Sequence, residues 1–161
     1  MQRVYIETTI PSFYYNLRSE PEMVARMNWT REWWDCHRMA YELVTSPAVL
    51  KELLQQDHPL KQEKAGLIQH LPFLEPSDEI RDIVETYIAR KVMPGDAEGD
   101  ALHLALASFY RCDVLLTWNC AHLANFNKFV HIRRVNVALG LFVPQLLTPL
   151  ELTQTLEDDE N

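Results

Sequence analysis

The segment Asp113–Trp118 is the feature of the sequence that most constrains the fold. After its first residue the segment is almost continuously apolar, and the residues before it, from Gly99 to Tyr110, are apolar on nearly every side of a helix. A helix that is apolar all round is buried, and a strand without polar alternation is covered on both faces, as in a parallel sheet. The chain is therefore expected to fold around a parallel sheet with helices on both faces.

Strand-type and helix-type segments alternate along the rest of the chain. Val4–Ile6 and Val44–Thr45 have the pattern of short strands, and His131–Val135 is a candidate for the last strand. Expected helices, several opened by a capping residue or a first-turn proline, cover 22–43, 47–55, 60–70, 78–92, a stretch from Asp96 or Gly99 to Tyr110, and a C-terminal stretch from 149. This alternation predicts a helix-rich α/β fold, a three-layer α/β/α sandwich with a mainly parallel central sheet.

Length and composition fit one globular domain. The chain has 161 residues, of which 47% are hydrophobic and 24% charged, enough for one full core. No apolar run approaches the roughly 18 residues that cross a membrane, and the N-terminus has no secretory signal pattern, so a cytoplasmic location is expected. The odd number of widely spaced cysteines, at 36, 112 and 120, argues against a disulfide framework. We expect one domain over residues 1–152 and a disordered acidic tail over 153–161.

The charge of the chain limits its partners. The formal net charge is −8, and residues 157–160 supply four of the negative charges. This balance argues against a broad phosphate-binding surface, although nucleic acid could still bind locally. Cys120 and His122 form a pair without a second pair of ligands nearby, so no zinc site is expected there. Trp29 and Trp33 share one helix face, which fits a packed core or a partner groove.

Polar residues at the ends of the expected elements form the candidate site. Glu7 directly follows the first strand, Glu52 lies one and a half turns into the helix after the second, Asp100 opens the buried helix, and Asn119 follows Trp118. Ligands of open α/β sheets bind beyond the carboxyl ends of the strands, where the fold should gather these four residues. Each also has an ordinary explanation, as a solvated residue, a first-turn acid or a turn former.

Carboxylates that cluster in this way repel one another, and burial adds to the cost. A divalent cation with oxygen ligands, Mg²⁺ or Mn²⁺, relieves both effects, and such an ion orients water and neutralises phosphodiester charge. Two neighbours leave alternatives open. Asp96 suits a helix cap or a place in the site, and His103, on the same helix face as Asp100, suits a hydrogen-bonded core histidine or a catalytic base.

Four motifs, "YIETTIPSFY", "SPAVLKELL", "DALHLALA" and "LLTWN", stand in an order that resembles the PIN-domain family, in particular its bacterial VapC-like branch. The segments "TREWW" and "TWNCAHLAN" resemble a subgroup in which glutamate and asparagine take the first and fourth acidic positions. The resemblance covers residues 3–151, nearly the whole chain.

This resemblance implies an α/β/α fold that binds Mg²⁺ or Mn²⁺ and cleaves RNA, commonly as the toxin of a type II toxin–antitoxin pair. An RNA substrate, an antitoxin protein and a homodimer would be its partners, with no membrane involved. The implied site residues are Glu7, Glu52 and Asp100 as metal ligands, Asn119 at the fourth acidic position, and Thr8 and Thr117 as hydroxyls that steady the site.

Two departures from the family pattern bear on activity. Glutamate at position 7 is one methylene longer than the usual aspartate, which moves the carboxylate outward by about 1.5 Å, and Asn119 offers a neutral oxygen. The three remaining carboxylates carry a charge of −3, which suits one resident ion better than two.

Two main hypotheses for function follow. One is a metal-dependent endoribonuclease, and Glu52 and Asp100 favour it. The other is a PIN-like module with weakened catalysis that binds RNA or protein, which Glu7, Asn119 and the acidic net charge favour. A phospho-accepting receiver domain is a third class, but it would need an acidic pair and a later lysine placed differently. Four basic residues are unranked candidates for phosphate contacts: Arg31, Arg38, Lys51 and Lys128.

Overall fold

The computed structural model describes residues 1–93 and 98–160. Its strands are β1 (Arg3–Ile6), β2 (Glu42–Val44), β3 (Val114–Leu116) and β4 (Gln145–Leu147). Its helices are α1 (Thr9–Tyr14), α2 (Pro21–Cys36), the short 3-10 helix η1 (Arg38–Ala40), α3 (Pro47–Gln55), α4 (Lys61–Ile68), α5 (Asp78–Ala89), α6 (Glu98–Phe109), α7 (Phe126–Ala138) and α8 (Pro149–Asp159).

Within the described residues, the four strands form one sheet in the order β2-β1-β3-β4, and every neighbouring pair is parallel. The two central strands are completely buried over Val4–Ile6 and Val114–Leu116. The apolar segment that most constrained the fold therefore lies at the centre of a parallel sheet, as its composition predicts. The register sets Ile6 beside Leu116, so the residues that follow these two strands emerge together.

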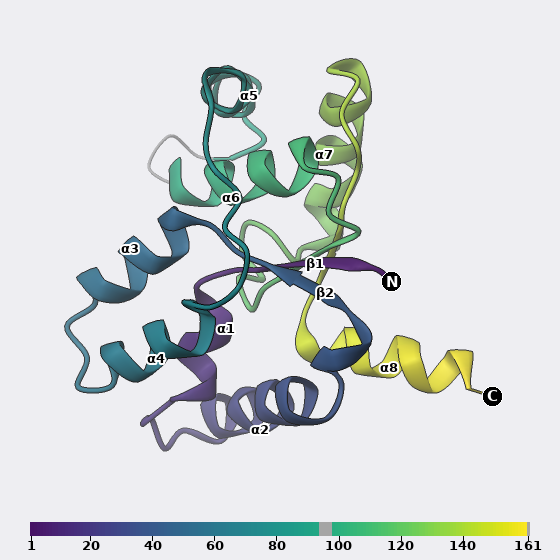
Figure 1. Cartoon of the computed structure of the whole chain (residues 1–161). Coiled ribbons are helices and arrows are strands. Elements are labelled where there is room, and N and C mark those ends of the chain that lie inside the picture. The colour runs from purple at the N-terminus through teal and green to yellow at the C-terminus, as the bar shows by residue number, and fades with distance from the viewer. Residues whose placement is uncertain (94–97, 161) are drawn as a thin grey trace.

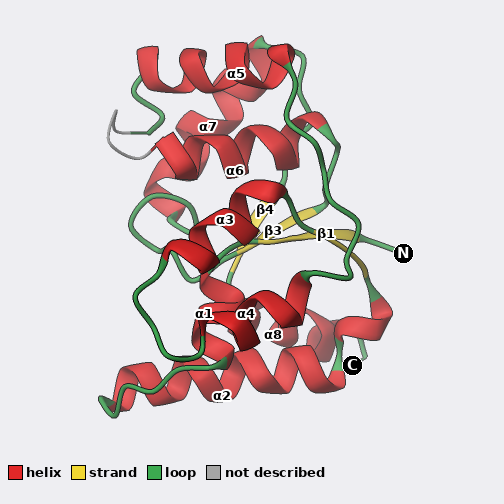
Figure 2. Cartoon of the chain, turned by 60° about the vertical axis from the view of Figure 1, so that its left-hand side comes forward, coloured by secondary structure: helices red, strands yellow, loops and turns green. Residues whose placement is uncertain are grey.

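Helices cover both faces of the sheet (Figures 1 and 2). Helices α5, α6 and α7 lie on one face, and α1, α2, α4 and α8 lie on the other. On the first face α5 packs against α6, and on the second α2 packs against α1 and α8. The predicted helix-rich, three-layer α/β fold is confirmed. None of the helices over residues 1–93 and 98–160 has both the length and the apolar character needed to span a bilayer.

The strand predicted at His131–Val135 is wrong, because these residues lie inside α7. The buried residues of this helix, Ile132, Val135 and Asn136, follow the three- and four-residue spacing of a helix face. At the start of α7, Asn125 caps the helix by accepting a hydrogen bond from the backbone N–H of Asn127 at 3.0 Å. The last strand is β4, later in the chain.

Other boundaries also differ from the sequence expectations, most of all at two places. The helix expected over 22–43 ends at Cys36, because the backbone leaves the helical region at His37, and β2 begins at Glu42. At the C-terminus, residues 153–159 continue α8, whereas a disordered tail was expected. A capping box formed by Thr148 and Glu151 fixes the start of α8 and supports the turns that follow.

Candidate functional site

The site begins where β1 and β3 end side by side. Because Ile6 and Leu116 are partners in the sheet, the next residues, Glu7 and Thr117, are neighbours. The Glu7 backbone N–H donates to the Leu116 carbonyl at 3.3 Å, and the Thr117 hydroxyl donates to Glu7 Oε2 at 2.8 Å. Parallel pairing alone therefore brings two distant parts of the chain to one point on the rim of the sheet.

Glu7 is a buried carboxylate, with only 4% of its surface exposed. Besides Thr117, the backbone N–H and the hydroxyl of Thr9 donate to Oε2, at 3.0 Å and 2.5 Å. Burial raises the pKa of Glu7, although the charge of His103 and the bonds from Thr9 and Thr117 oppose this effect. Among the described residues no hydrogen bond ends on Oε1, so one oxygen of this carboxylate is left for a ligand.

Glu52 reaches the same point from α3, which follows β2. Ser46 precedes this helix and Pro47 takes its first position, as the sequence predicts. His103 Nε2 lies 3.0 Å from Glu52 Oε1 and 3.1 Å from Oε2, and the Thr8 hydroxyl donates to Oε2. Burial pushes the pKa of Glu52 upward, but the hydrogen bond and charge of His103 together with Thr8 outweigh burial and hold it below its usual value.

His103, on α6, fixes the orientation of Glu52. Its ring is 1% exposed, and its Nδ1 lies 2.7 Å from the Tyr5 hydroxyl, which lies 2.7 Å from the Ser46 hydroxyl. Burial lowers the pKa of His103, but the bond to Glu52 and the charges of Glu52, Glu7 and Asp100 raise it further, so the net shift is upward. When both ring nitrogens carry protons, Nδ1 donates to Tyr5 and Tyr5 donates to Ser46.

One ligand atom from each of Glu7, Glu52 and His103 lies within 4.8 Å of the other two. This buried acidic and histidine group could hold a metal ion. Two carboxylates suit a hard cation such as Mg²⁺ or Mn²⁺, while an imidazole ligand also suits transition metals. The residues fit such an ion, because Glu7 keeps one oxygen free of hydrogen bonds. There is also little room for a side chain next to Glu52, since a methyl group at Gly99 would lie only 2.9 Å from Glu52 Oε1. The absence of a side chain at Gly99 therefore keeps room beside the carboxylate.

The structure brings together some of the residues predicted for the site and not others. Thr117 bonds Glu7, His103 and Thr8 bond Glu52, and the ligand atoms of Glu7, Glu52 and His103 lie close together. Sequence reasoning missed Thr9, Tyr5 and Ser46, and only the repeated threonine after Glu7 gave a signal for any of them.

Asp100 and Asn119 lie outside the group of three ligand atoms. Asp100 is half-buried on α6, one turn before His103, and its charge helps to raise the pKa of His103. Asn119 caps the turn after β3, since its Oδ1 accepts from the His122 backbone N–H at 3.0 Å. The metal roles of these two residues remain predictions, and Asp96 lies outside the described residues.

The other candidates take part in local contacts. Arg31 and Arg38 each lie over an aromatic ring and donate to a backbone carbonyl at 2.8 Å, Lys51 is exposed, and Lys128 Nζ lies 3.4 Å from His122 Nδ1. Cys120 does not belong to any group of metal-binding side chains found in the described residues.

An aromatic cluster adjoins the carboxylates. The Trp118 backbone N–H donates to the Thr9 hydroxyl at 2.8 Å, and the Trp118 ring stacks on that of Trp29 at 6.1 Å between centroids. The guanidinium of Arg26 lies 5.3 Å from the Trp118 ring centroid. Trp29, assigned from sequence to a core or a partner groove, is 36% exposed and offers a stacking surface beside the site.

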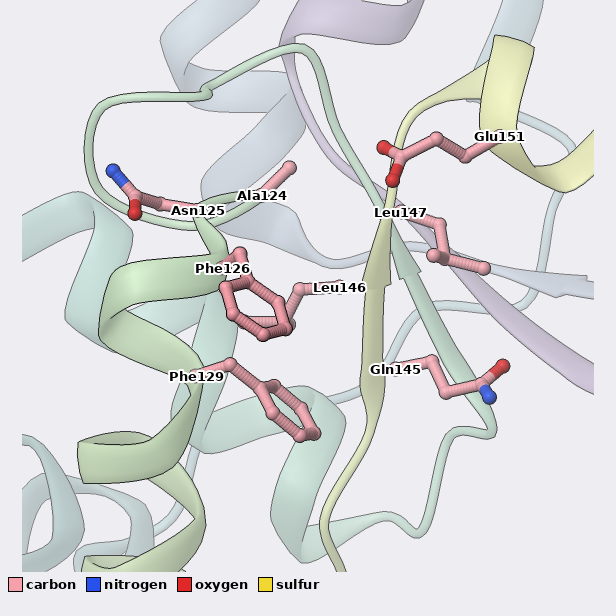
Figure 3. Close-up of a pocket in the computed structure, with 8 residues that line it drawn as sticks. All are labelled: Ala124, Asn125, Phe126, Phe129, Gln145, Leu146, Leu147 and Glu151. Carbon is pink, nitrogen blue, oxygen red and sulfur yellow. The ribbon is translucent and has the colours of Figure 1, made fainter.

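A separate apolar pocket of about 280 Å³ lies between α7 and β4 (Figure 3). Phe126 and Phe129 project from α7 toward Leu146, and Glu151 lies at one end of the pocket. None of the residues that line it belongs to the carboxylate and histidine group, so this pocket has no part in the site.

Comparison with known proteins gives no independent assignment of this site. No protein-family model matches the chain, and no curated protein matches it by sequence.

Proposed function

We propose that this chain is a metal-dependent endoribonuclease of the PIN-domain type. The observation that carries the proposal is the approach of Glu7, Glu52 and His103 within 4.8 Å at the rim of a parallel sheet. The resemblance of the four sequence motifs to the VapC-like branch supports the choice of RNA as substrate. A bound Mg²⁺ or Mn²⁺ would supply an activated water and would neutralise charge on the phosphodiester.

The residues of the chain would hold and orient the parts of this site. Glu7 and Glu52 would provide carboxylate oxygens to the ion. Thr9 and Thr117 fix the rotamer of Glu7 through Oε2, and His103 fixes Glu52. Because Glu7 is almost completely buried, its negative charge acts in a low-dielectric environment and attracts a cation more strongly than a surface carboxylate would. We expect one resident ion.

The experiment is cleavage of single-stranded RNA by the purified chain in Mn²⁺, with an EDTA control. Glu7→Gln and Asp100→Asn should abolish cleavage, whereas Glu63→Gln, at an exposed position on α4, should leave it unchanged. Equal activity in wild type and both site variants would identify a contaminant and would refute the proposal. Calorimetric titration with Mn²⁺ that gave two tight sites without RNA would contradict a single resident ion.

A binding module without catalysis is the second candidate. Both oxygens of Glu52 are already engaged by His103 or Thr8, and the carboxylate of Asp100 lies outside the group, so the ligand set is smaller than the resemblance implies. This candidate predicts that the chain binds RNA but does not cleave it in Mg²⁺ or Mn²⁺.

The role as a toxin rests on the motif resemblance alone. If the chain is the toxin of a toxin–antitoxin pair, its induced expression should arrest bacterial growth, and Glu7→Gln should relieve the arrest. Coexpression with a protein encoded next to it should restore growth if that protein is the antitoxin. Normal growth with the soluble wild-type chain would contradict this role.

A further inference from the structure

Lys64, on α4, is a buried lysine without a counter-ion. Its exposed fraction is 4%, and its ammonium donates to Gln56 Oε1 at 3.0 Å, a neutral acceptor. No ion pair found among residues 1–93 and 98–160 includes Lys64. Lysine is almost never buried unless it is paired, because removing an ammonium from water is costly. An anion would therefore stabilise the charged form of Lys64, and the described residues do not supply one.

Lys64 lines a pocket that has the composition of an anion site. The pocket has a volume of about 200 Å³ and is bordered by α1, α2 and the region between α3 and α4. Arg18 and His58 line it beside Lys64, and none of the lining residues is acidic. Arg18 is bonded to the exposed Glu20 at 3.1 Å, an arrangement that leaves other guanidinium donors for a ligand. Phe13 and Leu17 contribute an apolar wall.

A chain of hydrogen bonds joins this pocket to the carboxylate group. From Lys64 it passes through Gln56, whose Nε2 donates to the Ser12 hydroxyl at 3.1 Å. Ser12 donates to the Thr8 carbonyl at 2.8 Å, and the Thr8 hydroxyl donates to Glu52. Gln56 lies one helical turn after Glu52, about 6 Å along the axis of α3. The pocket is thus a neighbour of the candidate metal centre.

We propose that the Lys64 pocket binds a phosphate group of single-stranded RNA next to the phosphodiester that is cleaved. This inference rests on the proposed function, since it places a second contact for the same substrate. Phosphate oxygens would supply the missing negative charge and would accept the unused N–H donors of Lys64 and Arg18. Burial lowers the pKa of Lys64, as expected for an ammonium that lacks a counter-ion, and burial together with the charge of Lys64 lowers the pKa of His58. In a chain of net charge −8, this pocket would concentrate phosphate affinity at one place.

The test is RNA binding without cleavage, measured by fluorescence anisotropy of a labelled single-stranded RNA in EDTA over a range of salt concentrations. Lys64→Met should weaken binding roughly tenfold, as the loss of a charged hydrogen bond does. It should also reduce the slope of log affinity against log salt by about 0.7, the value for one phosphate contact on a single strand. Lys61→Met is the matched control on the same helix, since Lys61 does not line the pocket, and it should keep the wild-type slope.

A second variant, Arg18→Gln, keeps the test decisive if Lys64→Met does not fold. If Lys64→Met fails to fold by circular dichroism, Arg18→Gln, at a side chain that is 65% exposed, should still reduce the salt slope. If wild type and these variants bind RNA with the same slope, the pocket proposal is overturned while the nuclease proposal stands.

The reverse failure has its own signature. If the wild-type chain binds no RNA, but inorganic phosphate or a phosphopeptide shifts the NMR signals of the His58 ring and Lys64→Met abolishes that shift, the assignment to RNA is overturned and the pocket is an anion site for another ligand.

Discussion

Helix α6 carries two buried polar networks that differ in charge. Near its start, His103 joins Glu52 and the Tyr5 hydroxyl at the rim of the sheet. Five residues later, Ser108 lies among Tyr87 of α5 and Asn136 of α7: Tyr87 donates to Asn136 Oδ1 at 2.6 Å, and Asn136 Nδ2 donates to the Ser108 hydroxyl at 2.9 Å and to the Phe142 carbonyl at 3.0 Å. Both networks are buried except at Glu52, whose side chain is 35% exposed.

The difference lies in what each network leaves unsatisfied. In the network of Tyr87, Ser108 and Asn136 every group is neutral and donors match acceptors, so burial costs little and the bonds tie three helices together. The network of Glu7, Glu52 and His103 places two carboxylates beside one imidazole and leaves Glu7 Oε1 without a donor among the described residues. A satisfied network serves the stability of the fold, and an unsatisfied charged one is expected where a ligand completes it.

The largest effect expected from this comparison is on stability, in Asn136→Ala. This change leaves the buried Tyr87 hydroxyl with only its longer bond to Ser108 at 3.3 Å and removes two further hydrogen bonds, so the free energy of unfolding should fall by about 3 kcal/mol. Urea unfolding followed by circular dichroism would measure the change. Asn127→Ala, at an exposed position of the same helix, should have almost no effect, and equal losses in the two variants would contradict a structural role for the Tyr87 network.

Glu7→Gln is expected to change metal binding and to leave the stability of the fold intact, the reverse of Asn136→Ala. Loss of one buried carboxylate should weaken Mn²⁺ binding by roughly 100-fold, the upper end of what altered metal partners cost. Stability of the metal-free chain should stay level or rise, because a buried charge is removed while Thr9 and Thr117 keep an oxygen to bond. Calorimetric titration with Mn²⁺, alongside urea unfolding in EDTA, separates the two effects. A variant that bound Mn²⁺ as wild type does would place the ion elsewhere.

The fold was predictable because its main signals are local. The apolar segment Asp113–Trp118 needs cover on both faces, and Pro47 and Pro149 mark helix starts whatever the rest of the chain does. The error at His131–Val135 has an equally local cause. Over five residues, β-branched and polar side chains fit a strand as well as a helix, and only the buried positions of the complete helix distinguish the two.

The site was predictable only in part. Residues at the ends of parallel strands must emerge at one edge, which is why Glu7 was expected on the rim, and Thr117, which the family resemblance alone placed at the site, emerges beside it. His103 bonds Glu52, which lies 51 positions earlier in the chain. That contact depends on how α6 is rotated about its own axis against α3, and the residues around His103 do not specify this rotation. Lys64 gave no signal at all, because a lysine in a short helix is normally solvated.

A smaller effect on the charged network is expected from Gly99→Ala. The added methyl group would lie 2.9 Å from Glu52 Oε1, so the carboxylate must move away from its position against His103. Mn²⁺ affinity should fall roughly tenfold, as it does when a group that orients a ligand is disturbed. The same titration measures it. Gly66→Ala is the matched control, since a methyl group there meets no atom within 4 Å and should leave Mn²⁺ affinity unchanged. Wild-type affinity in Gly99→Ala would mean that Glu52 need not keep this geometry.

The smallest effect is the response of each network to pH. His103 has a raised pKa in the folded chain, so its protonated form contributes stability below its ordinary value of 6.5, and that contribution is lost as the pH rises through the folded pKa. Glu52 has a lowered pKa, so its contribution is present above 4.5 and is lost as the pH falls through the folded value. In the other network burial raises the pKa of Tyr87 to about 12, and no group there changes charge near neutrality.

Urea unfolding in EDTA at a series of pH values from 6 to about 9 would reveal this response. His103→Gln, which can still donate to Glu52 but cannot titrate, should lose the decline in stability above pH 6.5. Asn136→Ala should be less stable at every pH yet keep the same decline as wild type, because its network is neutral over this range. If Asn136→Ala removed the pH dependence and His103→Gln preserved it, the division of α6 into a charged and a neutral network would be wrong.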